Sequence, residues 1–170
     1  MSTQMEEPDK TSQSKQRQRI SITTFGLACL CFLLPFCVLT CGNDRIDEKT
    51  YSGIDMMLLR FGNENPGFGG YADIFTILAF VMIIGGLILS IFKGNYIWRS
   101  ISGSAAVVCL MILYVYVRDQ IKYSSHEMAN FIEVKFRIGY FLALFFALVG
   151  AILNFRYDRE EKAEKKKAGT

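Results

Sequence analysis

Four long apolar stretches without a charged side chain constrain this chain more than any other feature of its sequence. They lie near residues 20–40, 74–92, 101–117 and 138–155, and polar segments separate them. A helix needs about 20 apolar residues to cross the hydrocarbon core of a bilayer, and each stretch is near that length. The core helices of a water-soluble protein would instead alternate apolar and polar faces. The pattern therefore predicts four transmembrane helices.

The connections between these stretches favour an antiparallel arrangement. Only the segment 93–99 links the second and third stretches, and so short a link makes them antiparallel neighbours. The predicted fold class is all-α: a polytopic membrane protein with four transmembrane helices in an antiparallel bundle. Residues 42–73 form an outer loop of about 30 residues that caps the bundle. Within it, the apolar segment 54–59 is expected to form a short helix or strand, or a plug. Pro35 is expected to bend the first helix near its outer end.

The positively charged side chains predict the orientation. With four crossings, the first tail, the middle connection and the last tail share one side of the membrane, and they contain twelve of the 19 Lys and Arg residues. The positive-inside rule places this side, and so both termini, in the cytoplasm. The domain boundaries follow: 1–19 is a disordered basic tail, 20–155 holds the four helices, and 156–170 is a charged tail. Pairs at i, i+4, such as Asp158/Lys162 and Glu161/Lys165, extend the last helix into this tail.

Small residues recur at a spacing of four in the last apolar stretch. A helix places such residues along one face, where they let another membrane helix approach closely. A glycine pair makes a similarly thin point in the second stretch. The residues predicted to mediate helix packing are Gly139, Ala143, Ala147 and Ala151 in the last stretch, with Gly85 and Gly86 in the second.

Two of the five cysteines suggest an enzymatic alternative. Cys37 and Cys41 lie four residues apart, on one face of the expected first helix, and would form the reactive pair of a membrane thiol–disulfide oxidoreductase. Against this hypothesis, the chain has no Cys-x-x-Cys motif and no second pair in the outer loops. Cysteine is also a common apolar filler at buried positions, so no catalytic residue is predicted.

Other chemistry finds little support in the residue types. His126 is the only histidine, and no cysteine or carboxylate accompanies it at a metal-ligand spacing, so neither a metal nor another cofactor is predicted. A proton-coupled transporter would need a charge at membrane depth, and the four apolar stretches contain none, so this function is not expected. A further alternative is a small oligomeric pore lined by Thr76 and Ser104, or a lipid-handling oligomer. Nucleic-acid binding is not expected, because acids and bases alternate in the last tail.

Short motifs carry a resemblance to a known group of proteins. Leu34-Pro35-Phe36 precedes Cys41-Gly42, and Tyr51-Ser52-Gly53-Ile54-Asp55 follows in the outer loop. Together with the stretch from Gly139 to Asn154, these motifs resemble small uncharacterised bacterial membrane proteins. That group has a Leu-Pro-aromatic and Cys-x-Gly-like element at the outer end of its first span. The resemblance implies four spans and a bacterial inner membrane, and it implies no activity.

The sequence therefore favours a non-enzymatic membrane protein that acts as an accessory subunit or a scaffold. Its expected surroundings are the lipid bilayer and either another membrane protein or further copies of the same chain. The outer loop 42–73 and the small-residue helix faces are the surfaces expected to meet such a partner.

Overall fold

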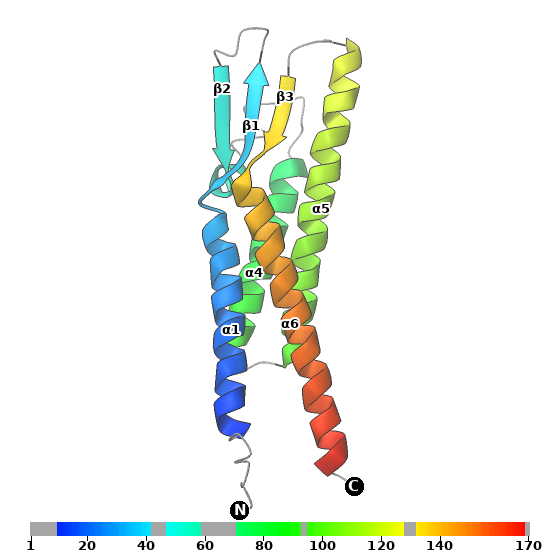
Figure 1. The fold of residues 1–170 in the computed structure, drawn as a ribbon. Helices are drawn as coiled ribbons and strands as arrows, with labels where there is room; N and C mark the ends of the chain where they lie inside the picture. The colour runs from blue at the N-terminus through cyan, green and yellow to red at the C-terminus, as the bar shows by residue number, and fades with distance from the viewer. Residues whose placement is uncertain (1–9, 42–46, 59–70, 93–94, 128–131, 169–170) are drawn as a thin grey trace, which may run out of the picture.

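Four long helices and a small β-sheet make up the computed structural model of the chain (Figure 1). The structure describes residues 10–41, 47–58, 71–92, 95–127 and 132–168. The helices are α1 (Lys10–Cys31), the short α2 (Gly53–Met57), α4 (Tyr71–Ile91), α5 (Tyr96–Glu127) and α6 (Ile138–Ala168). The strands are β1 (Pro35–Cys41), β2 (Asp47–Ser52) and β3 (Ile132–Phe136).

The four long helices lie side by side. Both α1 and α5 pack against α4 and α6, and the two ends of the chain lie at the end of the helices opposite the sheet (Figure 1). Three of these helices, α4, α5 and α6, are long and apolar enough to cross a membrane. Their outward faces expose large apolar side chains such as Val81, Val108 and Phe145, as lipid-facing surfaces do. The chain is therefore a membrane protein by the length and composition of its helices.

Helix α1 differs from the predicted first span at both ends. It begins at Lys10, so the prediction of a disordered tail is wrong for residues 10–19, while residues 1–9 lie outside the described part of the chain. It ends at Cys31, well before the predicted end near residue 40. Its apolar part, from Ile20 to Cys31, is about 18 Å long, which is shorter than the hydrocarbon core. This explains why α1 is not among the three helices that satisfy the length and composition of a span.

Contacts with the other helices order the polar first half of α1. The side-chain amide of Gln18 donates to the Ser90 carbonyl oxygen of α4 at 2.9 Å. Arg17 Nη2 lies 3.0 Å from Glu160 Oε2 of α6. The polar first half of α1 is thus helical and is held against the last turn of α4 and against α6 by its side chains.

The chain that follows α1 forms a strand, so the predicted bend at Pro35 within a longer helix is wrong. Pro35 instead begins β1, the central strand of an antiparallel sheet with the order β2-β1-β3. Proline disfavours helical geometry at the residue before it and cannot continue a helix in its interior, which explains the change of structure here. The fold is mostly helical, as predicted, but the connections from α1 to α4 and from α5 to α6 contain a sheet that the all-α prediction did not include.

Helix α6 continues past its apolar stretch to Ala168, as predicted. Lys162 Nζ lies 2.6 Å from Asp158 Oδ2, and Lys165 Nζ lies 2.6 Å from Glu161 Oε1. These are the i, i+4 pairs expected from the sequence, and such pairs support exposed helices. Helix α5 also runs past the predicted span 101–117, to Glu127.

The small residues of α6 lie where its neighbours come close. Ala143 and Ala147 are fully buried, and Ala151 is nearly so. A Cβ atom added to Gly103 of α5 would lie 3.1 Å from Ala151 Cβ and 3.2 Å from the Ala147 carbonyl oxygen. The backbones of α5 and α6 therefore approach closely at this level, and a glycine permits it.

The three glycines predicted for packing differ in how tightly they are held. A Cβ atom added to Gly86 would lie 2.7 Å from the buried Phe25 ring of α1, and one added to Gly139 would lie 2.7 Å from the Pro35 carbonyl oxygen. At Gly85 the nearest atom would lie at 3.5 Å, an ordinary van der Waals distance. The close approaches are therefore at Gly86, for α1, and at Gly139, for the start of β1.

Enlarging Ala147 should weaken the contact between α5 and α6. We expect Ala147→Leu to lower the free energy of unfolding by roughly 1–3 kcal/mol, because Ala147 is fully buried at the level where α5 and α6 approach closely and the added carbon atoms have no room. Thermal unfolding in mild detergent measures this change. Ser104→Leu, at an exposed position next to Gly103, is the matched control and should leave the melting temperature nearly unchanged. Equal melting temperatures for both variants and the wild type would contradict the packing.

Candidate functional site

The three-stranded sheet has two faces of different composition. Alternate residues of a strand point to opposite faces, so the pairing of the strands assigns each cross-strand row to one face. One face carries the rows Tyr51–Cys37–Phe136 and Lys49–Leu39–Val134. The other face carries the rows Thr50–Val38–Lys135 and Glu48–Thr40–Glu133. The first face is mainly apolar and the second mainly polar, as in an antiparallel sheet that covers a core on one side.

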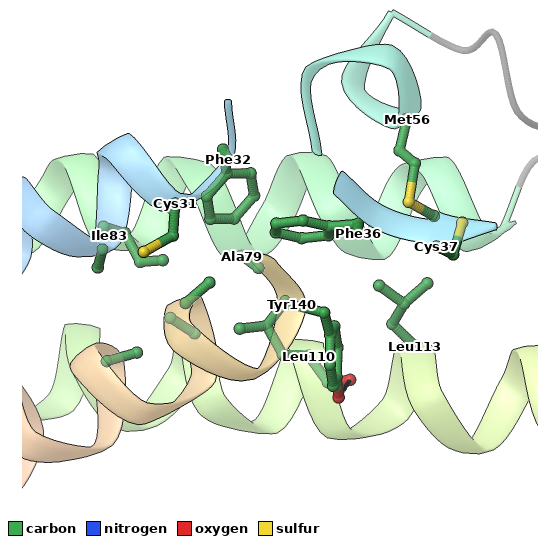
Figure 2. Close-up of a cluster of buried hydrophobic side chains, with 14 of the residues drawn as sticks. Cys31, Phe32, Phe36, Cys37, Met56, Ala79, Ile83, Leu110, Leu113 and Tyr140 are labelled. Carbon is green, nitrogen blue, oxygen red and sulfur yellow. Dashed lines mark hydrogen bonds between the residues drawn. The ribbon is translucent and has the colours of Figure 1, made fainter. Parts of the chain in front are cut away.

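The apolar face packs on the ends of the helices that lie opposite Lys10 and Ala168 (Figure 1). Figure 2 shows Phe36 and Cys37 of β1 among buried apolar side chains from α2, α4, α5 and α6. These two neighbours both join the core because the register of β1 and β2 shifts between Pro35 and Cys37, which is the geometry of a β-bulge. The bulge thereby gives the core one more aromatic ring than regular alternation would.

Tyr140 of α6 lies at the centre of an aromatic cluster beneath the sheet. Its ring centroid lies 4.7 Å from that of Phe136 in β3 and 6.0 Å from that of Phe36 in β1. Its hydroxyl donates to the Leu110 carbonyl oxygen of α5 at 2.8 Å. The backbone N–H of Arg137 also donates to the Phe36 carbonyl oxygen at 2.8 Å, so the sheet is attached to α6 at its first residues.

Helix α2 attaches β2 to the other side of the bundle. Ser52 and Asp55 form a capping box, in which the Ser52 hydroxyl accepts from the Asp55 N–H and the Asp55 carboxylate accepts from the Ser52 N–H. Gly53 lies against Phe32, where a Cβ atom would come within 2.9 Å of the carbonyl oxygen. The N–H of Ile54 donates to that same oxygen at 3.1 Å. The sheet is thus held at both sides and forms a rigid extension of the helices.

The β2 edge and the two margins of the polar face are exposed. Glu48 and Thr50 of β2 and Lys135 of β3 are exposed on the polar face, whereas Val38 between them is buried. Lys49 of β2 is also exposed, although its row belongs to the apolar face. Among the described strands, none pairs with the outer edge of β2, whereas β3 lies next to α5 (Figure 1). The backbone groups of an edge strand are able to pair with a strand of another chain. Charged side chains along β2 limit indiscriminate pairing, so a partner has to match them.

The structure changes the geometry of the proposed redox pair. Cys37 and Cys41 lie on one strand and not on one face of a helix, so their Cα atoms are about 13 Å apart. A disulfide needs Cα atoms within about 7 Å of each other. The two cysteines therefore cannot form the reactive pair of the enzymatic alternative. The side chain of Cys41 lies outside the described part of the structure.

Cys37 is also chemically unsuited to redox work. Its side chain is 1% exposed. Burial, and to a lesser extent the charge of Asp73, raise the pKa of the Cys37 thiol to about 12. The thiolate is the reactive form of cysteine, so at neutral pH this side chain remains an inert apolar filler. This agrees with the filler interpretation of the cysteines.

The remaining sequence candidates are not brought together. His126 falls in the last turn of α5, and its side chain lies outside the described part of the structure. Within the described residues, no three His, Cys, Asp or Glu side chains are placed to hold a metal ion. Thr76 is fully buried and donates to the Ala72 carbonyl oxygen at 2.9 Å, whereas Ser104 is exposed on α5. These two hydroxyls therefore do not share a surface that would line a pore.

The sequence contained two local signals for the sheet region that the prediction did not use. Residues 132–136, IEVKF, alternate apolar and charged side chains, which is typical of a half-buried strand. Ser52 and Asp55 have the spacing of a capping box, which indicates the start of a helix. Neither signal by itself identifies β1 as the shared partner of the other two strands.

The low reactivity of Cys37 can be measured directly. In the folded protein at neutral pH, the raised pKa lowers its thiolate fraction about a thousandfold, and the higher nucleophilicity of a more basic thiolate offsets only part of this. We expect alkylation of Cys37 to be slow, and to accelerate as the pH rises toward 12. Peptide mapping by mass spectrometry after a timed maleimide reaction reports the rate. The denatured chain is the control, and equally rapid labelling in both states would contradict the burial.

Comparisons with known proteins give no functional information for this chain, so its function is inferred from its geometry. No protein-family model matches the chain, and no curated protein matches it in sequence. The resemblance to small bacterial membrane proteins in the Leu34-Pro35-Phe36 region therefore stays a prediction. The features that bear on function are three apolar helices, a sheet fixed to their ends, and the exposed edge of that sheet.

Proposed function

We propose that this chain is a non-enzymatic membrane protein, an accessory subunit or scaffold, whose sheet binds a protein partner outside the membrane. The observation that carries the proposal is the attachment of the sheet. Its apolar face is fixed to α5 and α6 through Tyr140, and its strand β2 is fixed through α2. A surface held in this way keeps its shape when a partner binds, so little ordering opposes binding.

Strand addition is the mode of binding that this surface supports. An extended segment of the partner would pair with the outer edge of β2 through main-chain hydrogen bonds. Glu48, Lys49 and Thr50 would then select the segment, because they present an acid, an amine and a hydroxyl beside that edge. The partner segment that fits this pattern best has a positively charged side chain opposite Glu48 and a negatively charged one opposite Lys49.

The same proposal includes four crossings with both termini in the cytoplasm. Its support is the depth of α1 in the bundle: the buried Phe25 ring lies against Gly86 of α4 and within 3.3 Å of a Cβ added at Gly150 of α6. Ser21 lies 2.7 Å from the Ser90 hydroxyl and donates to Asn154 Oδ1 at 3.1 Å. The apolar start of β1 lengthens the apolar path beyond α1. The bacterial inner membrane has the sequence resemblance alone as its support.

Position-specific photocrosslinking tests the binding surface. A photoreactive amino acid at Thr50 should give a discrete protein adduct in native membranes, because this side chain is exposed beside the β2 edge. The same probe at Val108, on the lipid-facing side of α5, should give no protein adduct of that size. Adducts at neither position would contradict the proposal.

A charge reversal in the same assay tests whether β2 selects the partner. Lys49→Glu should reduce the Thr50 adduct several-fold, because like charges replace an attractive pair across the new strand boundary. Arg19→Glu, at the opposite end of the bundle, makes the same change in net charge and should leave the adduct unchanged. Equal losses in both variants would point to a general effect of charge and not to the edge.

Reporter fusions test the crossings. A reporter that is active in one compartment only, fused to either end of the chain, should give the same result at both ends, and that compartment should be the cytoplasm. A third fusion within residues 42–46, between β1 and β2, should report the opposite side. Opposite results at the two termini would show an odd number of crossings and exclude α1 as a span.

A further inference from the structure

Arg99 is buried at the end of the bundle that lies opposite the sheet. It belongs to the first turn of α5, and only 2% of its surface is exposed. Its Nε and Nη1 atoms are buried and have no hydrogen-bond partner among the described residues. Arginine keeps its charge in proteins, and buried guanidinium donors without a hydrogen bond are strongly unfavourable. The position therefore calls for an anion.

The groups around Arg99 satisfy it only in part. Its guanidinium carbon lies 4.7 Å from the centroid of the Tyr96 ring, which is a cation–π distance. The ring centroids of Tyr96 and Tyr157 lie 5.9 Å apart, and the guanidinium carbon of Arg17 lies 5.4 Å from the centroid of the Tyr157 ring. Two arginines thus flank a pair of tyrosines, with contributions from α1, α5 and α6.

The carboxylates near this cluster are engaged with other cations. Glu160 lies 3.0 Å from Arg17. Glu161 acts on Arg99 electrostatically, but its Oε1 atom lies 2.6 Å from Lys165 Nζ. Asp158 lies 2.6 Å from Lys162. The described carboxylates therefore leave the Nε and Nη1 donors of Arg99 without a hydrogen bond.

Two independent features at this place attract an anion. The first is the buried guanidinium with unused donors. The second is the beginning of α5 at Tyr96, since the first N–H groups of a long helix carry a partial positive charge and suit phosphate oxygens. Trp98 lies between them in sequence and is 59% exposed. Tyrosine and tryptophan mark the level of the lipid headgroups in membrane proteins, which is where lipid phosphates lie.

We propose that Arg99 and the first turn of α5 form a binding site for a phosphate group at the membrane face next to both termini. The guanidinium donates to the phosphate oxygens, together with the N–H groups of the first turn other than those of Trp98 and Arg99, which bond to the Asn95 carbonyl oxygen. The Tyr96 ring holds the guanidinium in place. The phosphate belongs either to an anionic lipid headgroup or to a soluble phosphate compound, and one assay distinguishes these sources. This site is separate from the sheet and does not depend on its having a partner.

Trp98, the only tryptophan of the chain, is a built-in reporter for this site. The full-length protein is placed in phosphatidylcholine vesicles that contain a small share of brominated phosphatidylglycerol or of brominated phosphatidylcholine. Bromine quenches a nearby tryptophan, so a bound anionic lipid should quench Trp98 more strongly than the zwitterionic lipid does. Arg99→Gln should weaken this preference by about tenfold, as expected for a lost charge-assisted hydrogen bond.

The matched control is Arg156→Gln. Arg156 is exposed on α6 at the same end of the bundle, so the variant removes one positive charge and leaves Arg99 in place. It should keep the preference of the wild type. A separate arm adds inorganic phosphate to the protein in detergent without anionic lipid. A fluorescence change of Trp98 that depends on Arg99 identifies a soluble phosphate as the ligand, whereas no change together with a lipid preference identifies the headgroup.

Two outcomes overturn the proposal, and a second variant decides if Arg99→Gln fails to fold. Equal quenching of the wild type by both brominated lipids, with no response to inorganic phosphate, overturns it. So does a folded Arg99→Gln protein with the full preference. If that variant does not fold, Arg99→Lys decides, because it keeps the charge but changes the donor geometry. A reduced preference in the Lys variant supports the site, and an unchanged one overturns the role of the guanidinium.

Discussion

The contacts of Tyr140 connect the membrane helices to everything outside them. Its buried ring touches Phe36 and Phe136, which belong to two different strands, and its hydroxyl bonds to the Leu110 carbonyl oxygen of α5. Each aromatic pair of this kind contributes about 0.5–1.5 kcal/mol beyond its buried area. A small sheet of three strands needs such support, because short antiparallel strands are marginally stable when they are alone. The sheet is therefore stable as a continuation of the bundle and not as a domain of its own.

The other end of the bundle depends on polar contacts instead. Ser21 of α1 bonds to both Ser90 of α4 and Asn154 of α6, and Gln18 bonds to the end of α4. In a hydrocarbon environment polar groups have to be satisfied within the protein, and each such bond adds only about 0.6 kcal/mol. Their value is in geometry, since they set the depth and rotation of α1 relative to helices that are far more apolar. Apolar packing around Phe25 supplies the close contact between those fixed points.

The sequence was sufficient to predict α4, α5 and α6, because a long charge-free run has few alternatives to a spanning helix. It was insufficient for the segment after α1. Pro35 to Cys41 is apolar and short, and such a run suits a buried strand as well as a helix. What decides the outcome is pairing with residues 47–52 and 132–136, which lie far away in the chain. For that reason the sheet, and with it the candidate binding surface, could not be predicted from the sequence. In the sequence, Arg99 contributed only one positive charge to the prediction of orientation. Packing alone buries its Nε and Nη1 atoms without a hydrogen-bond partner.

Strand β1 has one further consequence for how this protein can change over time. Both outer connections pair with it, and Phe36 forms the bulge that adjusts its alignment. Inserting or deleting one residue within β1 would turn the following side chains to the wrong face with respect to β2 and β3 together. Descendants of this chain can thus lengthen the segments between strands far more easily than the central strand. Relatives that have diverged beyond ordinary sequence comparison should still share a constant distance from the end of α1 to Cys37.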